Sequence, residues 1–236
     1  MDGFLLVDKP KGMTSHDVVF SLKRKFKLNK IGHTGTLDPF ASGLLILCVG
    51  KATKLSDLFL NLDKTYEGRL VFNQHYDTYD TTGELVESND VDIDEKKLQI
   101  EVKHMIKPYN QLPPMFSAIK QDGKKLYELA RQGIEVERKT RPIEIYDFKL
   151  TSDLMQNEVD FYISVSKGTY IRSVAVDLAK KLNTYGALKE LRRLSVGSYH
   201  VKHAQTLEDI EQKDLLTLNQ FFKNYPKVIL NDYMIK

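Results

Sequence analysis

The chain has 236 residues, of which 42% are hydrophobic and 28% are charged, and its formal net charge is +3. This composition excludes a disordered, fibrous or collagen-like protein and allows one large domain, or two small ones, with a substantial core. No stretch reaches the roughly 20 apolar residues that cross a bilayer, and the single cysteine allows no internal disulfide, so we expect a cytoplasmic protein without membrane contact.

The first half of the chain mixes short strands with amphipathic helices. Residues 3–12 predict a strand that ends in a turn containing proline and glycine. Thr14 or Ser15 is the expected cap of the helix that follows. The apolar run "LLILCVG" predicts a buried strand in which Cys48 is a small hydrophobe. The next expected elements are a helix over 51–60, a strand over 64–72 and a polar hairpin or binding loop over 73–87.

The second half continues the same mixture. Periodicity and capping signals predict helices over 94–106, 124–133 and 169–183, and strands over 141–150, 157–168 and 192–201. The elements show no regular βαβ rhythm. We therefore predict the α+β class, with a central mixed, mostly antiparallel sheet that is flanked by helices and crossed by an active-site cleft.

A glycine-rich segment, "GHTGTLDPFASG" over 32–43, stands ahead of the buried strand and contains His33 and Asp38. Asp followed by Pro commonly opens a turn, and aspartate commonly caps a short helical turn. Taken alone, the segment therefore favours a structural turn over a functional site. Glycines also allow the backbone to approach a ligand closely, so a functional loop stays open as the alternative.

Basic residues gather in clusters although the chain is nearly neutral. These clusters are Lys23–Lys25 with Lys27 and Lys30, Arg138–Lys139 with Arg141, Lys180–Lys181, and Arg192–Arg193. Such clusters predict either a positive face for a polyanion or solvated helix faces, and charge alone does not separate the two. If the clusters bind RNA, affinity should fall steeply with salt.

Several familiar motifs are excluded. "VGKAT" follows an apolar run that cannot form a phosphate loop, and "GHTG" leads into a strand, unlike the loop of a KH domain. The six histidines show no metal-ligand spacing, and "GxSxG" is absent. We therefore expect no metal and no cofactor, and a site built from Asp, His, Tyr and Arg.

Five blocks then occur in order along the chain: "GFLLVDKPKGMTSHDVV", "KIGHTGTLDPFASGLLILCVGKATK", "KTYEGRLVF", "PPMFSAIKQDGKKLYELARQG" and "VSKGTYIRSVAVDLA". Together, from about Gly3 to about Val201, they resemble the TruB family of tRNA pseudouridine synthases. The resemblance implies the pseudouridine synthase fold and conversion of uridine 55 to pseudouridine in the T arm of tRNA. It also implies that no protein partner is required, and we expect a monomer.

Carried over position by position, the resemblance implies roles for seven residues. Asp38 would be the essential catalytic aspartate, and Arg172 would pair with it inside the pocket. Tyr66 would stack on the target base. Four further residues would bind the substrate: His33 would contact the tRNA, Tyr170 would line the pocket, Leu191 would pack against the uracil, and Asp80 would help to hold the flipped nucleotide.

The chemistry of these residue types agrees with the implied roles. Isomerising uridine oxidises nothing and donates no group, so neither a metal nor a nucleotide is required. A carboxylate serves as nucleophile or as stabiliser of a cationic sugar, and a neighbouring arginine favours its charged form. A base that is stacked inside RNA must be flipped out and gripped by an aromatic face.

We expect residues 1–205 to form the catalytic domain and residues 206–236 to form a short extension. Many TruB proteins continue into a PUA module, a small domain that holds more of the tRNA. The present sequence stops at "NYPKVILNDYMIK", so we expect that module to be absent. The alternative function is a non-catalytic chaperone that binds and folds tRNA, against which the intact Asp38, Tyr66 and Arg172 argue.

Overall fold

A nine-stranded sheet runs along the molecule, whose structure is a computed structural model that describes residues 1–121 and 123–223. The main strands lie in the order β1-β3-β12-β4-β11-β10-β7, while β2 pairs with β3 and β13 pairs with β12. The strands of this sheet are β1 (Gly3–Lys9), β2 (Ile31–His33), β3 (Ser42–Val49), β4 (Lys64–Phe72), β7 (Pro108–Gln111), β10 (Arg141–Leu150), β11 (Glu158–Val165), β12 (Gly186–Val196) and β13 (Tyr199–His200).

Helices and two small hairpins are added to this sheet. The α-helices are α1 (Ser15–Lys25), α2 (Ser56–Leu60), α3 (Glu95–His104), α4 (Leu126–Ala130), α5 (Ile171–Lys181) and α6 (Leu218–Phe221). The hairpins pair β5 (Gln74–Tyr76) with β6 (Leu85–Ser88), and β8 (Lys120–Gln121) with β9 (Lys124–Lys125). Short 3₁₀ turns cover Gly50–Leu55, Val201–His203 and Gln212–Asp214.

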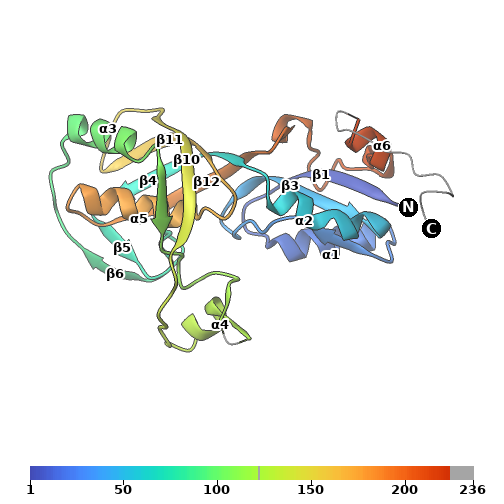
Figure 1. Cartoon of the computed structure of the whole chain (residues 1–236), viewed down its shortest axis with the longest axis horizontal. Coiled ribbons are helices and arrows are strands. Elements are labelled where there is room, and N and C mark those ends of the chain that lie inside the picture. The colour runs from blue at the N-terminus through green and yellow to red at the C-terminus, as the bar shows by residue number, and fades with distance from the viewer. Residues whose placement is uncertain (122, 224–236) are drawn as a thin grey trace.

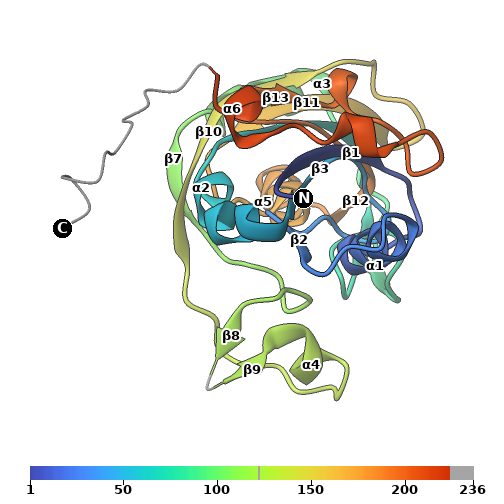
Figure 2. The same cartoon turned by 90° about the vertical axis from the view of Figure 1, so that its right-hand side faces the viewer.

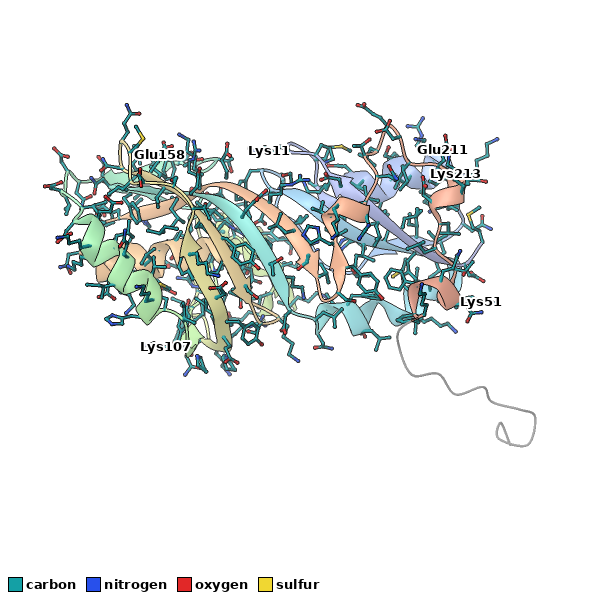
Figure 3. All side chains as sticks on the ribbon, turned by 90° about the horizontal axis from the view of Figure 1, so that it is seen from above. Lys11, Lys51, Lys107, Glu158, Glu211 and Lys213 are labelled. Carbon is teal, nitrogen blue, oxygen red and sulfur yellow. The ribbon has the colours of Figure 1, made fainter. Side chains whose placement is uncertain are left out.

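The body is elongated, with α1 and α2 towards one end and α3 and α5 towards the other (Figure 1). Viewed along its long axis, the segment that carries β8, β9 and α4 projects away from the sheet (Figure 2). Seen from above, Lys107 and Glu158 lie towards the α3 end, and Lys51, Glu211 and Lys213 lie towards the opposite end (Figure 3).

Strands β3 and β12 join the two halves of the sheet. They run parallel, with Ser42 opposite Arg192 and Gly43 opposite Arg193, whereas the other pairings between the named strands of the described residues are antiparallel. Gly43 has a φ of +105°, and a Cβ atom there would lie 2.3 Å from the carbonyl oxygen of Arg193. The junction therefore requires glycine for its backbone conformation and for its close approach.

Three hydrophobic clusters hold the layers together. One cluster lies between a single face of β4, β10, β11 and β12 and the helices α3 and α5 (Figure 1). The other two clusters lie on opposite faces of β1 and β3, so that Leu44, Ile46 and Cys48 face one way while Leu45 and Leu47 face the other. Burial on both faces explains why this strand is an uninterrupted apolar run.

The predicted α+β class, with a mixed, mostly antiparallel sheet flanked by helices, is confirmed. Strands are found over Gly3–Lys9, Lys64–Phe72 and Arg141–Leu150, where the sequence predicts them. The polar segment after β4 forms the β5–β6 hairpin. Thr14, rather than the alternative Ser15, caps α1, because its side chain accepts from the backbone nitrogen of Asp17.

Other elements differ from prediction. The predicted helix over 51–60 is a 3₁₀ turn followed by α2. The helix predicted over 124–133 is shorter at both ends, since α4 covers only Leu126–Ala130. Lys124 and Lys125 pair with β8 instead, and the turn after α4 reaches Gly133, whose φ is +71°. Strand β12 begins at Gly186, six residues before the predicted start at 192, and ends in a turn before β13. A register shift between Leu188 and Glu190 interrupts the alternation of side chains along β12. The pattern of the sequence therefore does not predict the early part of this strand. Strands β2 and β7 have no counterpart in the prediction.

The described part of the carboxyl-terminal segment packs on β1. Leu216 bridges to Phe4, and the ring of Phe221 stacks on the ring of Phe4 at 4.0 Å between centroids. The sequence prediction for "NYPKVILNDYMIK" concerns residues 224–236, which lie outside the described residues. In the part of the chain that is described, no helix is long and apolar enough to cross a membrane.

A pair of glycine substitutions tests the importance of the β3–β12 junction. Gly12 and Gly43 both have positive φ, but a Cβ atom meets nothing within 4 Å at Gly12 and the Arg193 backbone at Gly43. We expect Gly12→Ala to lower the free energy of unfolding by about 1 kcal/mol through backbone strain alone. Gly43→Ala adds a steric clash, for a loss of about 3 kcal/mol. Chemical denaturation measures both, and equal losses would contradict the proposed close approach.

Candidate active site

Asp38 lies in the segment that connects β2 to β3, beside the parallel junction of the sheet. The backbone nitrogen of Ala41 donates to the Asp38 carbonyl at 3.1 Å, so the residue also opens a turn, as its position before Pro39 predicts. The predicted turn is therefore present. It uses the backbone carbonyl of Asp38, which leaves the side-chain carboxylate free for other contacts. The side chain is 33% exposed and can be approached from solvent.

Three side chains from other elements fix the backbone on both sides of Asp38. Ser15, in the first turn of α1, exchanges hydrogen bonds with the backbone of Leu37 at 2.8 and 3.2 Å. The buried ammonium group of Lys9 donates to the carbonyls of Pro10 and Met13, and at 3.5 Å to that of Pro39.

Arg193 is the third of these side chains, and it is also buried. Its guanidinium donates to the carbonyl of Leu44 at 2.7 Å and to the carbonyls of Gly35 and Thr36 at 3.3 Å. Because these carbonyls flank Asp38 in the chain, a single arginine on β12 holds both ends of the segment that carries Asp38. Such satisfied buried donors give the segment one defined conformation.

Arg172, in the first turn of α5, pairs with Asp38 through two atoms. Its Nε lies 2.9 Å from Oδ2 and its Nη2 donates to Oδ1 at 3.2 Å. The same guanidinium donates to the carbonyls of Thr78 and Phe116, each at 2.8 Å, and its Nη1 lies 3.7 Å from the Asp80 carboxylate. The predicted pairing of Arg172 with Asp38 is confirmed. A buried arginine with this many acceptors is held rigidly.

Asp80 completes the charged group from the end of the β5–β6 hairpin. Its buried carboxylate accepts from the backbone nitrogen of Thr82 at 3.0 Å and from the Thr82 hydroxyl at 2.5 Å. The neighbouring backbone is tied to β12, because Asp80 bridges to Leu188. Asp38, Arg172 and Asp80, which are far apart in the sequence, therefore meet in one cluster.

Tyr66 and Leu191 belong to the main hydrophobic core. Both are buried, on the neighbouring strands β4 and β12, and they share one hydrophobic cluster with Leu37 and Ala41 of the segment that carries Asp38. Burial raises the pKa of the Tyr66 hydroxyl. The structure therefore places an aromatic ring and an aliphatic side chain close to the Asp38 segment.

Tyr170 caps α5 and is fixed by Gln111 of β7. The Gln111 amide accepts from the Tyr170 nitrogen at 2.9 Å and donates to its carbonyl at 3.1 Å, as a paired strand would. The half-buried Tyr170 ring thereby stands two residues along the chain from Arg172. Burial raises the pKa of its hydroxyl.

His33 is the last residue of β2, rather than part of a loop as the glycine-rich sequence suggests. It lies opposite Leu47, and its Nδ1 atom is buried without a hydrogen-bond partner among the described residues. Burial lowers the pKa of the imidazole, and Arg193 lowers it further. No hydrogen bond joins His33 to Asp38 within the described structure, so it stands at the margin of the cluster.

The electrostatic balance at Asp38 depends on Arg172. Burial raises the pKa of the Asp38 carboxyl, the Arg172 guanidinium opposes that rise, and the Asp80 carboxylate adds to it. The resulting pKa lies above the ordinary value. Lys9 also favours the ionised carboxylate, although burial lowers the pKa of its own ammonium group to about 8.

Sequence reasoning missed Lys9, Gln111 and Arg193 as supporting residues. A lysine at the end of an apolar strand, before Pro10, is the only local signal for Lys9. Gln111 and Arg193 act on segments more than 50 residues away, which no local pattern reveals. Among the described residues, no group of three His, Cys, Asp or Glu side chains could hold a metal ion.

Several arginines of the predicted basic clusters are paired or buried within the protein. Arg192 binds both oxygens of Asp8 at 2.6 and 3.0 Å, Arg193 is buried, and the side chain of Arg138 is only 9% exposed. Arg138 and Arg193 are therefore largely withdrawn from the surface, whereas Arg192 is 34% exposed and its charge is paired with that of Asp8. The lysines and arginine of and after α1 remain exposed, namely Lys23, Arg24, Lys27 and Lys30.

Comparison with known proteins identifies the family to which this chain belongs. Residues 23–171 match the family described as TruB family pseudouridylate synthase, N-terminal domain. The chain belongs to the TruB family. It is 52% identical to "tRNA pseudouridine synthase B" of Onion yellows phytoplasma (strain OY-M) and 47% identical to the protein of that name from Acholeplasma laidlawii (strain PG-8A). Each alignment covers 100% of this chain and 84% of the relative.

Chains of two solved complexes share the fold. One chain of a "Cbf5-Nop10-Gar1 Complex" superposes with a TM-score of 0.69 at 28% identity, over 94% of this TruB-family chain and 56% of the other. A chain of an archaeal "box H/ACA sRNP Nop10-Cbf5 complex" gives a TM-score of 0.64 at 26% identity, over 88% and 52%. The chain thus spans little more than half the length of these solved proteins.

Removal of Arg172 tests the electrostatic balance directly. We expect Asp38 to titrate above the ordinary range of an aspartate, and Arg172→Gln to raise its pKa further, because the nearest positive charge is lost. Carbon-13 NMR of the side-chain carboxyl groups follows the titration. The matched control is Arg69→Gln, which breaks an ion pair with Asp160 and leaves Asp38 untouched. An Asp38 pKa that stays constant or falls in Arg172→Gln would show that the pairing does not set its charge.

Proposed function

We propose that this chain isomerises uridine to pseudouridine in tRNA, and that its target is position 55 in the T arm. The observation that carries the proposal is the ion pair of Asp38 with Arg172 in a member of a pseudouridylate synthase family. The substrate follows from relatives at 47–52% identity that bear the name "tRNA pseudouridine synthase B". The choice of position 55 rests on the family resemblance of the sequence blocks.

Asp38 is the catalytic residue in this proposal. The reaction breaks the C1′–N1 bond, turns the uracil and joins C1′ to C5, after which C5 loses a proton and N1 gains one. A partly exposed carboxylate can attack the sugar or stabilise its positive charge. Arg172 is the positioning residue, since it holds both carboxylate oxygens and favours their ionised state. The atoms balance without any cofactor.

The aromatic and polar neighbours bind the flipped nucleotide. Tyr66 stacks on the uracil and Leu191 packs against it, because both share the apolar cluster that contacts the Asp38 segment. Tyr170 lines the pocket next to Arg172, and Asp80 accepts hydrogen bonds from the nucleotide. His33, whose buried Nδ1 atom has no partner among the described residues, contacts the RNA from the margin of the site.

The exposed basic residues of and after α1 supply contacts to the RNA backbone. Ser15 of this helix touches Leu37, so the helix leads outward from the catalytic segment. An RNA that places a uridine at Asp38 can follow these charges, and its affinity should fall with salt as counterions are released.

The remaining parts of the proposal concern organisation. Residues 1–205 form the catalytic domain. The chain acts in the cytoplasm as a monomer and requires no protein partner. No metal or nucleotide is needed, because the reaction is an isomerisation.

A T-arm hairpin tests the function. We expect the chain to convert one uridine of this hairpin, the one at position 55, to pseudouridine in the presence of EDTA, and mass spectrometry after ribonuclease digestion locates the product. The control is the same hairpin with cytidine at position 55, which should yield no product. Binding of the hairpin without conversion would favour the chaperone. Loss of turnover in EDTA that added metal restores would contradict the cofactor-free reaction.

A further inference from the structure

A chain of hydrogen bonds joins strand β7 to helix α5 at the edge of the site. It begins at Tyr170, whose backbone is paired with the carboxamide of Gln111, and the amide nitrogen of Gln111 also donates to the hydroxyl of Tyr109 at 3.1 Å. The Tyr109 hydroxyl donates in turn to the carboxylate of Asp177 at 3.1 Å. The roles proposed above leave Tyr109 and Asp177 unused.

Regular spacing on two elements creates this chain. Tyr109 and Gln111 are two residues apart on β7, so their side chains leave the same face of that strand. Tyr170 and Asp177 are seven residues apart, which places them on one face of α5, about two helical turns from each other. Strand β7 is thereby fastened to α5 at the start of the helix and again further along it.

Each group in the chain has a fixed direction. The Tyr170 nitrogen can only donate, so it holds the Gln111 oxygen, and the Gln111 nitrogen is turned towards the Tyr109 oxygen. The hydroxyl proton of Tyr109 is then left for Asp177, whose ionised carboxylate can only accept. Burial raises the pKa of the Asp177 carboxyl, whereas the Tyr109 hydroxyl and two lysines in the last turn of α5 oppose that rise. A satisfied network of this kind is rigid.

Gln111 stands at the point where the chain reaches the site. It is 2% exposed although its side chain is polar. Tyr170 begins α5 without a side-chain cap among the described residues, so the Gln111 carboxamide ties the start of the helix to the sheet. The neighbouring residues repeat the connection, because the Ser173 hydroxyl donates to the carbonyl of Leu112 at 2.8 Å.

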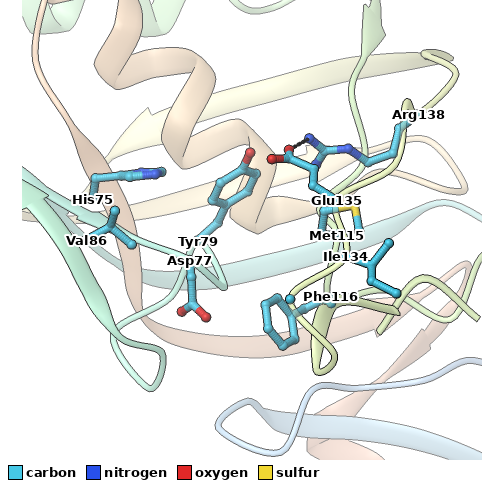
Figure 4. A pocket seen from close by; sticks show the side chains of 11 residues that line it. His75, Asp77, Tyr79, Val86, Met115, Phe116, Ile134, Glu135 and Arg138 are labelled. Carbon is cyan, nitrogen blue, oxygen red and sulfur yellow. Dashed lines mark hydrogen bonds and ion pairs between the residues drawn. The ribbon is translucent and has the colours of Figure 1, made fainter. Parts of the chain in front are cut away.

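The segment that follows Gln111 leads to the walls of the site. Its Phe116 lines a cavity of about 290 Å³ together with Tyr79, which belongs to the β5–β6 hairpin (Figure 4). Arg172 links the two walls, since it donates to the carbonyls of Phe116 and Thr78. A displacement of the first turn of α5 would therefore disturb this arginine and both segments that it holds.

We propose that Gln111 is a positioning residue for the reaction, and that Tyr109 and Asp177 act through it. The three residues hold the first turn of α5 so that the Tyr170 ring and the Arg172 guanidinium stand at the catalytic aspartate before RNA binds. The inference rests on the proposed function, because it takes that aspartate to carry out the chemistry. It gives a part in the reaction to a carboxylate whose hydrogen bond lies outside the site.

Single-turnover rates separate a positioning role from a purely structural one. Gln111→Met keeps the length of the side chain and removes its hydrogen bonds. With the protein in excess over a T-arm hairpin, we expect the rate constant for pseudouridine formation to fall about tenfold, because displaced groups act on the chemical step. The Kd for the hairpin should stay within about twofold of the original value, since contacts to the RNA backbone dominate affinity.

A double-variant cycle tests the order of the chain. We expect Tyr109→Phe to lower the rate constant about threefold, and its combination with Gln111→Met to lower it no further than the tenfold of Gln111→Met alone. Losses that multiply to about thirtyfold would contradict an action through Gln111. Tyr109→Phe with Asp177→Leu replaces a buried polar pair by apolar groups of similar shape, so this variant should fold and keep the loss of about threefold.

The matched control is Thr184→Val, just after the other end of α5. The Thr184 hydroxyl is buried and hydrogen-bonded to Asn73 and Asn89. Its removal should lower the melting temperature of the protein, as a structural role requires, and leave the rate constant within about twofold of the original. An unchanged rate constant in Gln111→Met, or an equal loss in Thr184→Val, would overturn the inference.

A measurement without RNA separates this inference from the proposed function. If the first turn of α5 moves in Gln111→Met, Arg172 pairs less closely with Asp38 while Asp80 and Lys9 keep their charges. The pKa of Asp38 should then rise, as carbon-13 NMR of the carboxyl groups records, and the control variant should leave it constant. A constant Asp38 pKa in Gln111→Met would contradict the positioning role, whereas absence of pseudouridine with the original protein would contradict the proposed function alone.

Discussion

The ion pair between Asp38 and Arg172 joins segments that the chain keeps far apart. The arginine side chain is 5% exposed, and removing such a cation from water is costly unless acceptors surround it. Asp38, Thr78, Phe116 and Asp80 supply those acceptors, from the segment between β2 and β3, the hairpin end and the segment before α4. The need to satisfy one buried guanidinium thus brings the walls of the site together, and it fixes the carboxylate in the same step.

The surrounding fold serves this pair by holding the backbone on each side of it. Strands β3 and β12 meet in parallel at Gly43, and Arg193 reaches from that junction to the carbonyls of Gly35 and Thr36. The Asp38 carboxylate is therefore placed by rigid strands although it stands on a connecting segment. In the proposed reaction such placement matters, because a charge stabilises a developing cation most when it does not have to reorganise.

Much of this arrangement could be predicted from the sequence, and the rest has identifiable causes. Strand β4 and helices α1, α3 and α5 follow from regular periodicity and caps, and family blocks point to Asp38 and Arg172. The start of β12 was missed because bulges break its alternation. The supporting contacts of Gln111 and Arg193 were missed because they join residues distant in sequence. The left-handed conformation of Tyr79 is maintained by a local turn contact to Tyr76 and by a hydrogen bond from the distant Leu188, and no local signal predicts the second of these.

The most direct test of the account is single-turnover pseudouridine formation by Asp38→Asn, measured with RNA binding and a thermal melt. The amide keeps the size of the side chain and loses its charge and nucleophilicity. We expect a folded protein that binds the T-arm hairpin within a few-fold of the original affinity and forms no product. Asp8→Asn, which weakens the outer pair with Arg192, is the matched control and should keep full turnover. Substantial product from a clean Asp38→Asn preparation would contradict the account and return Asp38 to the role of a turn residue.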